Sequence, residues 1–166
     1  MPSAASFDIT STIDFQEVDN ALNQARKEVG QRYDFKGAIA EIDLSVADKK
    51  LTLTTSDEMK MNALWEILQT RLVRRSVPVK NFKVGDSQPA AGGTVRRVIE
   101  IQQGIPIEAA REIVKFIKDR KLKKVQAAIQ ADQVRVSSPS KDELQDAMRA
   151  LRDHDFGVAL QFGNYR

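Results

Sequence analysis

Seven consecutive residues after position 30 bring together cations, aromatic rings and a carboxylate. Residues 31–37 read QRYDFKG, and four of them are candidate contacts to a ligand: Arg32, Tyr33, Phe35 and Lys36. An arginine presents a planar fork to a phosphate or a guanine edge, a lysine adds a point charge, and a tyrosine or phenylalanine ring offers a flat face to a purine. The chemistry that this mixture favours is non-covalent binding of a base and its phosphate.

The same seven residues also fit the end of a helix that binds nothing. In that interpretation Phe35 is buried, while Arg32 and Lys36 lie along the surface or interact with the C-terminal carbonyl groups of the helix. Basic and aromatic residues are common at helix ends, so residue type alone favours this structural interpretation over ligand binding. Both interpretations stay open at this point.

The strongest positive charge in the chain lies between residues 115 and 124. This segment, KFIKDRKLKK, holds six cations and one acid, Asp119. Arg111, Lys115 and Lys118 are spaced at i, i+4 and i+7, which places them on one face of a helix. Such a stripe attracts polyanions, but an equally good explanation is a solvated face that stabilises the helix C-terminus and keeps the protein in solution.

Side chains for covalent or metal chemistry are scarce. The chain has no cysteine, which excludes thiol nucleophiles, thiolate zinc sites and iron–sulfur clusters. Its one histidine, His154, lies in the polar run RDHD and cannot form a histidine-based metal cluster. The sequence contains no phosphate-binding loop, dinucleotide fingerprint or hydrolase motif. We therefore expect no enzyme, no metal and no cofactor, and a histidine exposed in a loop.

Composition and charge limit the class of protein further. The 166 residues are 42% hydrophobic and 30% charged, with a net charge of +3 that comes from residues 94–166. The N-terminus lacks a basic region followed by an apolar run, and no stretch approaches the roughly 20 apolar residues of a membrane helix. These features predict a cytoplasmic protein without a membrane segment, in which anions are attracted mainly to the second half.

Hydrophobic periodicity predicts the elements that must position these residues. In the first half, alternating and i, i+3, i+4 patterns indicate, in order, a strand, a helix, two strands, a helix and a strand. Their approximate residues are 6–10, 14–29, 39–44, 51–54, 56–75 and 79–84. The first helix begins at Asp14, which forms a capping box with Glu17.

The second half repeats the same order of elements. Its strands and helices are expected at residues 94–101, 106–118, 125–129, 133–136, 140–151 and 159–162. The last helix begins with a capping box, Ser140 to Glu143. Each half therefore predicts a β-α-β-β-α-β, ferredoxin-like domain of the α+β class, with two helices on one face of a four-stranded antiparallel sheet.

The predicted domains are residues 1–85 and 94–166. Between them, residues 86–93 are rich in glycine, alanine and other small side chains, which is typical of a linker. The N-terminal strand has two candidate sheets, that of its own domain and that of the other. The RNA recognition motif, a related arrangement, stacks bases on aromatic residues of its third strand. The corresponding strands here contain no aromatic residue, so base stacking on the open sheet is not expected.

Five segments spread over the whole chain match one known pattern in order. They are SFDI at 6–9, RYDFKG at 32–37, IKDRKLK at 117–123, QAAIQAD at 126–132 and LQFGNYR at 160–166. Together they resemble the YajQ family, small bacterial proteins built of tandem RNP-like (ferredoxin-like) domains. Because several long segments match in order, the resemblance is more specific than any single short motif.

The resemblance implies a cytoplasmic nucleotide-binding protein rather than an enzyme. Cyclic di-GMP is the ligand most associated with the family, GTP, ATP and RNA are others, and in signalling members the bound state changes contact with a transcription regulator. The matching positions are Arg32, Tyr33, Phe35, Lys36, Lys118, Lys121, Lys123 and Arg135. The expected function is that of a cyclic di-GMP effector. The alternative is a general RNA-binding protein that uses the basic surface of the second domain.

Overall fold

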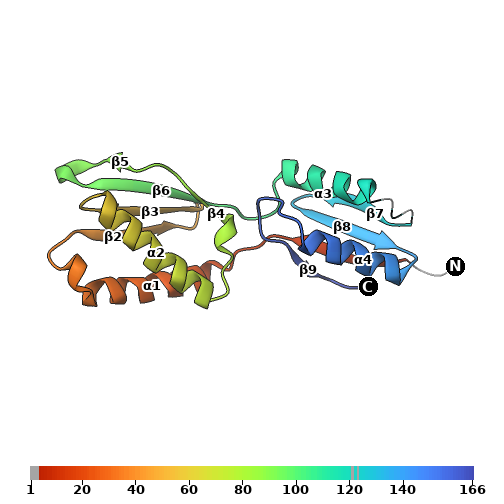
Figure 1. The fold of residues 1–166 in the computed structure, drawn as a ribbon, viewed down its shortest axis with the longest axis horizontal. Helices are drawn as coiled ribbons and strands as arrows, with labels where there is room; N and C mark the ends of the chain where they lie inside the picture. The colour runs from red at the N-terminus through yellow and green to blue at the C-terminus, as the bar shows by residue number, and fades with distance from the viewer. Residues whose placement is uncertain (1–3, 121, 123) are drawn as a thin grey trace. The chain divides into compact units, whose positions relative to one another are not determined.

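The computed structural model describes residues 4–120, 122 and 124–166, which form two compact units (Figure 1). The central unit comprises Ile13–Gln102. The terminal unit combines the N-terminal segment up to Thr12 with Gln103–Arg166. Each unit has its own antiparallel sheet and its own hydrophobic core.

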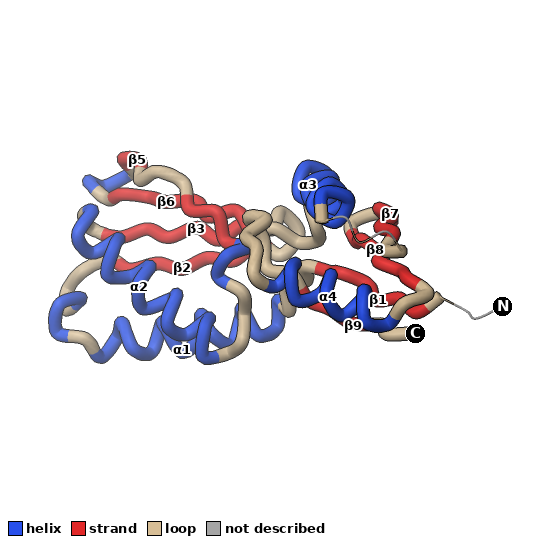
Figure 2. Tube along the Cα trace, turned by 45° about the vertical axis from the view of Figure 1, so that its right-hand side comes forward, coloured by secondary structure: helices blue, strands red, loops and turns tan. Residues whose placement is uncertain are grey.

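The central unit places two helices against one face of its sheet (Figure 2). Its strands run in the order β2-β3-β6-β4, and the short β5 pairs with β6. The elements are α1 (Phe15–Gln31), the 3₁₀ turn η1 (Tyr33–Phe35), β2 (Ala40–Ser45), β3 (Lys50–Thr55), α2 (Glu58–Arg74), the 3₁₀ turn η2 (Val79–Asn81), β4 (Phe82–Val84), β5 (Gln88–Pro89), the 3₁₀ turn η3 (Ala91–Gly93) and β6 (Val95–Ile101).

The terminal unit has the same layered arrangement with a sheet in the order β7-β8-β1-β9. Its elements are β1 (Ala5–Thr10), α3 (Ile107–Asp119), β7 (Gln126–Gln130), β8 (Gln133–Ser138), α4 (Lys141–Arg152) and β9 (Gln161–Gly163). Within the described residues, no helix is both long enough and apolar enough to cross a membrane.

Side-chain caps begin helices α1 and α4 where the sequence predicted them. The Asp14 carboxylate accepts hydrogen bonds from the backbone N–H groups of Gln16 and Glu17 at 3.0 and 3.4 Å. The Ser140 hydroxyl accepts one from the N–H of Glu143 at 3.3 Å. These bonds satisfy donors that a helix N-terminus leaves without an intrahelical partner. The caps predicted at Asp14 and Ser140 are confirmed, but the capping box at Ser140 is not complete, because the N–H of Ser140 donates to the Ser138 hydroxyl at 3.0 Å rather than to Glu143.

Alternation along the strands separates the core from the open face of each sheet. On β8, Val134 and Val136 are fully buried, whereas Arg135 between them is partly exposed. On β3, Leu51 and Leu53 are fully buried. Successive side chains of a strand point to opposite faces, so the apolar residues meet the helices and the polar ones remain on the open face. The predicted α+β, tandem ferredoxin-like class is confirmed.

The division of the chain differs from the predicted domains. Strand β1 lies between β8 and β9 of the terminal sheet, with Phe7 opposite Val136. Strand β6 lies between β3 and β4 of the central sheet, with Ile99 opposite Leu51. The first strand of each predicted domain thus pairs in the sheet of the other domain. Periodicity identifies a strand and its buried face, but both strands carry similar patterns and neither pattern specifies a partner.

The segment predicted as a linker, residues 86–93, also pairs with the central sheet. Gln88 lies opposite Arg96, and the Gly85 N–H donates to the Val98 carbonyl at 3.0 Å. Three residues, 85–87, lie opposite two, 97–98, between the neighbouring pairs, which defines a β-bulge. A Cβ atom at Gly85 would stand 2.9 Å from the Val98 carbonyl oxygen, so this close approach favours glycine.

Candidate functional site

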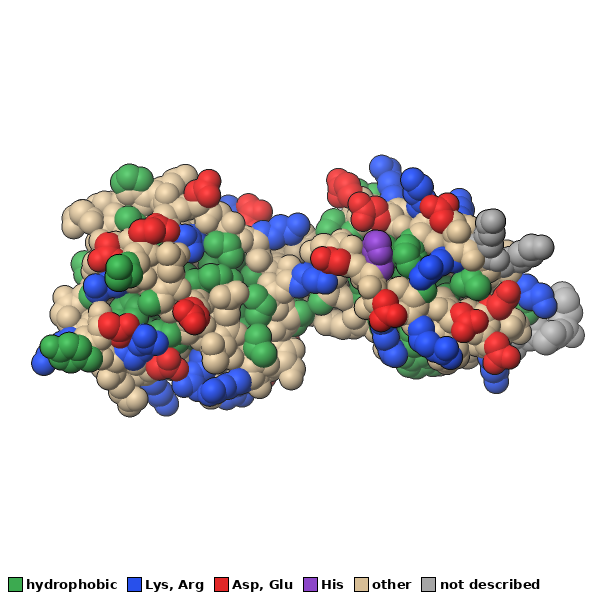
Figure 3. Space-filling view, in the orientation of Figure 1, with side chains coloured by type: hydrophobic (Ala, Val, Ile, Leu, Met, Phe, Trp, Pro, Cys, Tyr) green, Lys and Arg blue, Asp and Glu red, His purple; other side chains and the backbone are tan. Residues whose placement is uncertain are grey.

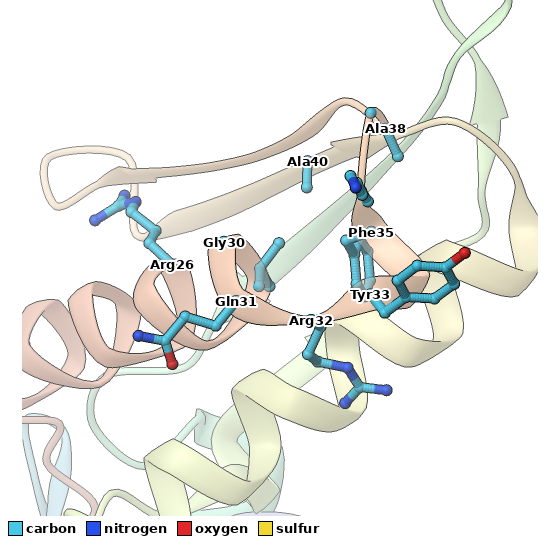
Figure 4. A pocket seen from close by; sticks show the side chains of 11 residues that line it. Arg26, Gly30, Gln31, Arg32, Tyr33, Phe35, Ala38 and Ala40 are labelled. Atoms are coloured by element: carbon cyan, nitrogen blue, oxygen red, sulfur yellow. The ribbon is translucent and has the colours of Figure 1, made fainter.

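A hollow of about 580 Å³ lies in the central unit where α1 ends and the chain turns into β2 (Figure 4). Gly37, at φ +75°, is in the left-handed region that glycine adopts without strain, and it helps the chain turn back toward β2. The lining includes most of the segment that the sequence singled out. The residues are Arg26, Val29, Gly30, Gln31, Arg32, Tyr33, Phe35, Lys36, Gly37, Ala38 and Ala40.

Arg32 is held by acidic neighbours. Its Nε and Nη2 atoms donate to the two carboxylate oxygens of Asp34 at 2.9 and 2.8 Å, and its Nη1 lies 3.7 Å from Glu28. The hydrogen bonds with Asp34 raise the pKa of Arg32, and the same bonds lower the pKa of Asp34. Figure 4 shows the guanidinium extending away from Ala38 and Ala40. A phosphate that uses Arg32 must therefore compete with a carboxylate already in place.

The two aromatic rings of the segment have opposite environments. Phe35 is 4% exposed and belongs to the core of the central unit, whereas Tyr33 is 87% exposed. The structural interpretation of the segment is thus correct for Phe35, whose ring supports the hollow from the core. Only Tyr33 has a ring face free enough to stack on a base.

Arg26 and Lys36 add positive charge to the rim. The Arg26 guanidinium donates to the side chain of Asn23 at 2.8 Å and to the backbone carbonyl of Ile42. Lys36 is exposed directly after η1. Sequence reasoning missed Arg26, which lies more than a helical turn before the QRYDFKG segment. Arg26 follows the buried Ala25 and lies about one helical turn after the buried Leu22, so it is at the border of the buried face of α1. This position was the signal in the sequence that could have identified Arg26.

The helix end itself favours hydrogen-bond donors. Carbonyl groups in the last turn of α1 carry partial negative charge, and that turn contains no basic side chain. Donor groups on a purine edge fit such a position, while a phosphate needs the cations on the rim. The arrangement therefore suits a ligand with both a donor-bearing base and an anionic group, oriented so that the two lie at different parts of the hollow.

The remaining predicted residues belong to the terminal unit. Lys118 is exposed in the last turn of α3, while Lys121 and Lys123 lie outside the described residues. Arg135 forms an ion pair with Asp8, its Nε donating to the carboxylate at 2.8 Å. This bond raises the pKa of Arg135 and, together with a bond from Asn164, lowers the pKa of Asp8. Among the described residues, the predicted site is thus divided between the hollow, with Arg32, Tyr33, Phe35 and Lys36, and the terminal unit, with Lys118 and Arg135.

Basic side chains along α3 form a second candidate surface, which we call the α3 cation surface: Arg111, Lys115, Lys118, Arg120 and Lys124. All five are exposed, and Figure 3 shows Lys and Arg side chains gathered over α3 with acidic ones among them. Within the described part of the chain, none of the five forms an ion pair. Anions in solution therefore meet cations whose charge is not already compensated by a bonded carboxylate.

His154 takes part in an aromatic cluster. Its ring centroid lies 4.8 Å from that of Phe116 and 4.6 Å from that of Phe156. The residue is exposed, as expected for a loop histidine. The described residues contain no group of three or more His, Cys, Asp or Glu side chains that could hold a metal ion.

Comparisons with known proteins identify the family of the chain. Residues 5–166 match the family model described as nucleotide-binding protein YajQ-like. A relative from Solibacter usitatus, named a nucleotide-binding protein, is 52% identical over 97% of this chain and 96% of its own length. Another with the same name, from Carboxydothermus hydrogenoformans, is 46% identical over the full length of both chains. The chain therefore belongs to the YajQ-like family of nucleotide-binding proteins.

Proposed function

We propose that this protein binds cyclic di-GMP in the hollow at the end of α1 and acts as an effector that changes its contact with a partner such as a transcription regulator. The observation that carries the proposal is the composition of the hollow. An exposed tyrosine ring, three cations and the carbonyl end of a helix line one space of about 580 Å³. The resemblance of the segment RYDFKG to the family supports the choice of ligand.

Each part of a guanine nucleotide has a matching group in the hollow. The guanine edge carries N–H donors for the carbonyl groups at the end of α1. Its flat face suits the ring of Tyr33, and a phosphate suits Lys36 and Arg26. Adenine presents an acceptor where guanine presents a donor, so we expect GTP to bind more tightly than ATP at this position.

Isothermal titration tests the ligand. The full chain is titrated with cyclic di-GMP, GTP, ATP and a short structured RNA at two salt concentrations. We expect saturable binding of cyclic di-GMP that depends weakly on salt, because the ligand has only two phosphates. Lys36→Ala and Tyr33→Ala should each weaken it by about tenfold. Lys27→Ala is the matched control, since Lys27 is exposed on α1 but does not line the hollow.

The outcome that contradicts the site is binding that Lys36→Ala and Tyr33→Ala both leave unchanged. The outcome that contradicts the ligand is no heat and no shift of the melting temperature at saturating cyclic di-GMP. The effector role requires in addition that ligand alter a surface away from the hollow. Amide hydrogen exchange with and without ligand measures this, and protection confined to the hollow would contradict the effector role.

The α3 cation surface supports a second candidate function, general RNA binding. Its five exposed cations follow a helix and the loop after it, which suits successive phosphates. RNA affinity should then fall steeply as salt rises, and Lys115→Ala with Lys124→Ala should weaken RNA binding while leaving cyclic di-GMP binding unchanged. If the double variant binds RNA as well as the parent protein does, the surface serves only to keep the protein in solution.

A further inference from the structure

Three of the four outer edges of the two sheets are protected against pairing with another strand. Strand β2 carries the charged residues Glu41 and Asp43, and Arg26 donates a hydrogen bond to the backbone carbonyl of Ile42 in this strand. Charged side chains and occupied main-chain groups make an edge a poor template for a further strand. The edge formed by β2 is therefore closed to pairing along its middle.

The edges formed by β4 with β5 and by β9 are protected in other ways. The first carries Lys83, the bulge at residues 85–87 and Pro89, which has no N–H to donate. The second, β9, is only three residues long. Short strands, bulges, lysines and prolines are the devices that natural sheets use at their edges.

The fourth edge, β7, has none of these devices. Its sequence QAAIQ contains no charge, proline or glycine, and all five residues pair with β8 without a bulge. A loop of two residues joins Gln130 to Gln133, and in such a hairpin the two residues that flank the loop hydrogen-bond to each other through their main chains. From this pair onward, hydrogen-bonded and non-hydrogen-bonded pairs alternate along an antiparallel ladder. The N–H and C=O groups of Ala127 and Ile129 consequently point away from the sheet.

The outer groups of β7 have no main-chain partner among the described residues. No backbone hydrogen bond outside the β7–β8 ladder involves residues 126–130 there. The side chain of Ile129 is 38% exposed beside this edge. An uncharged, regular strand with unpaired main-chain groups and an exposed apolar side chain is a template for β-strand addition.

The charge near β7 indicates what kind of strand fits. Lys124 lies two residues before the start of β7. Helix α3, which has Lys118 in its last turn and is followed by Arg120, packs against β7. All three cations are exposed, and none forms an ion pair within the described part of the chain. A second copy of this chain would bring two such groups of cations together, whereas an acidic segment would compensate them.

We propose that the edge of β7 accepts an extended acidic segment of a partner protein as a fifth strand of the terminal sheet. Main-chain groups of Ala127 and Ile129 bind the segment, and the α3 cation surface selects for its acidic side chains. A peptide fits this surface better than RNA does, because β7 offers a row of peptide-matching donors and acceptors but no aromatic ring for a base. The residues that would bind the segment lie outside the hollow, so the proposal does not depend on the nucleotide site.

Peptide titration of the isotopically labelled full chain tests the proposal by amide NMR. The probe is an acetylated and amidated octapeptide of alternating valine and glutamate. The comparison peptides are the valine–lysine equivalent and the valine–glutamate peptide with two central prolines. We expect the first peptide alone to shift the amides of Ala127 and Ile129 saturably and to slow their hydrogen exchange. The affinity should fall several-fold when salt is raised.

Variants separate the main-chain contribution from the charge. Ile129→Pro removes an outward N–H and should lower the affinity for the valine–glutamate peptide by about tenfold. Ile129→Val keeps the N–H, so this variant should bind the peptide as the parent protein does. Lys124→Glu should also lower the affinity for the valine–glutamate peptide without changing the amide spectrum of β8. The spectrum of each free variant shows whether the terminal unit is folded.

Three results would overturn the proposal. The first is the absence of a saturable shift at Ala127 and Ile129 with the valine–glutamate peptide. The second is equal binding of the proline-containing peptide, because this would indicate charge attraction without strand pairing. The third is a concentration-dependent dimer that shifts the same two amides in the absence of peptide, because the edge would then be occupied by a second copy. If the first result is found and a short structured RNA, titrated in the same way, shifts these amides, the surface is assigned to nucleic acid instead.

Discussion

Removal of the Phe7 ring tests the exchange of first strands between the two units. Phe7 is fully buried in β1, packs edge-on against Phe162 with ring centroids 5.7 Å apart, and lies opposite Val136. Phe7→Ala leaves a cavity in the terminal core, which costs about 3–5 kcal/mol. Because each 1.4 kcal/mol is a factor of about ten, amides of the terminal unit should open about two to four orders of magnitude more often.

Native-state hydrogen exchange, resolved by residue, measures where the protection is lost. In Phe7→Ala, the amides of α3, β8 and α4 should lose protection while those of β3 and α2 keep it. Ile99→Ala in β6 should do the reverse at a cost of about 2–5 kcal/mol, since Ile99 is fully buried in the central core. Val98→Ala is the control, because Val98 is 37% exposed on the open face and its loss should change little.

One result would refute the exchange directly. If Phe7→Ala lowers protection in β2 and β3 and leaves β8 unchanged, then β1 belongs to the domain that immediately follows it in the sequence. If Ile99→Ala destabilised α3 and α4 instead of α2, then β6 would likewise belong to the domain that follows it in the sequence.

Two further predictions concern single residues. The pKa of Asp8 lies below its ordinary value of 3.8, chiefly because Arg135 hydrogen-bonds its carboxylate. The stabilisation from this ionised carboxylate is complete above the pKa of Asp8 in the unfolded chain and is lost as pH falls through the lowered pKa of the folded chain. Asp8→Asn should therefore reduce the free energy of unfolding near pH 7 and make it fall less steeply toward acid pH, as measured by urea unfolding. Gly85→Ala should lower the free energy of unfolding by about 1–3 kcal/mol in thermal unfolding, because the new Cβ would meet the Val98 carbonyl oxygen. A Cβ atom at Gly163 would meet nothing within 4 Å.

The candidate site shows how much of its structure the residue types alone predict. The mixture of charges and rings at residues 31–37 singled out the segment that lines most of the hollow. It did not separate the roles of the two rings. Tyr33 and Phe35 are both aromatic, and only the packing of η1 against the core makes Phe35 buried and Tyr33 exposed. It also did not include Arg26, whose place at the rim depends on how α1 meets β2.

The competition for Arg32 is a second feature that the sequence left undetermined. Asp34 was visible two positions away, but an acid at that spacing lies beside the arginine only when the chain leaves the helix in the observed way. The same holds for Arg135 and Asp8, which are 127 positions apart and meet only because β1 pairs with β8. Charges that appear free in the sequence are in both cases already paired in the folded chain.

The sequence by itself determined the order and type of the main elements, their caps and their buried faces. These follow from short-range rules, since the spacing of apolar residues and the side chains at helix starts act over a few positions. Tertiary structure alone decided which sheet receives β1 and β6, that residues 88–89 extend an edge, and that β7 is left open. Strand pairing joins residues far apart in the chain, and the free energy that selects one partner comes from packing of the whole core.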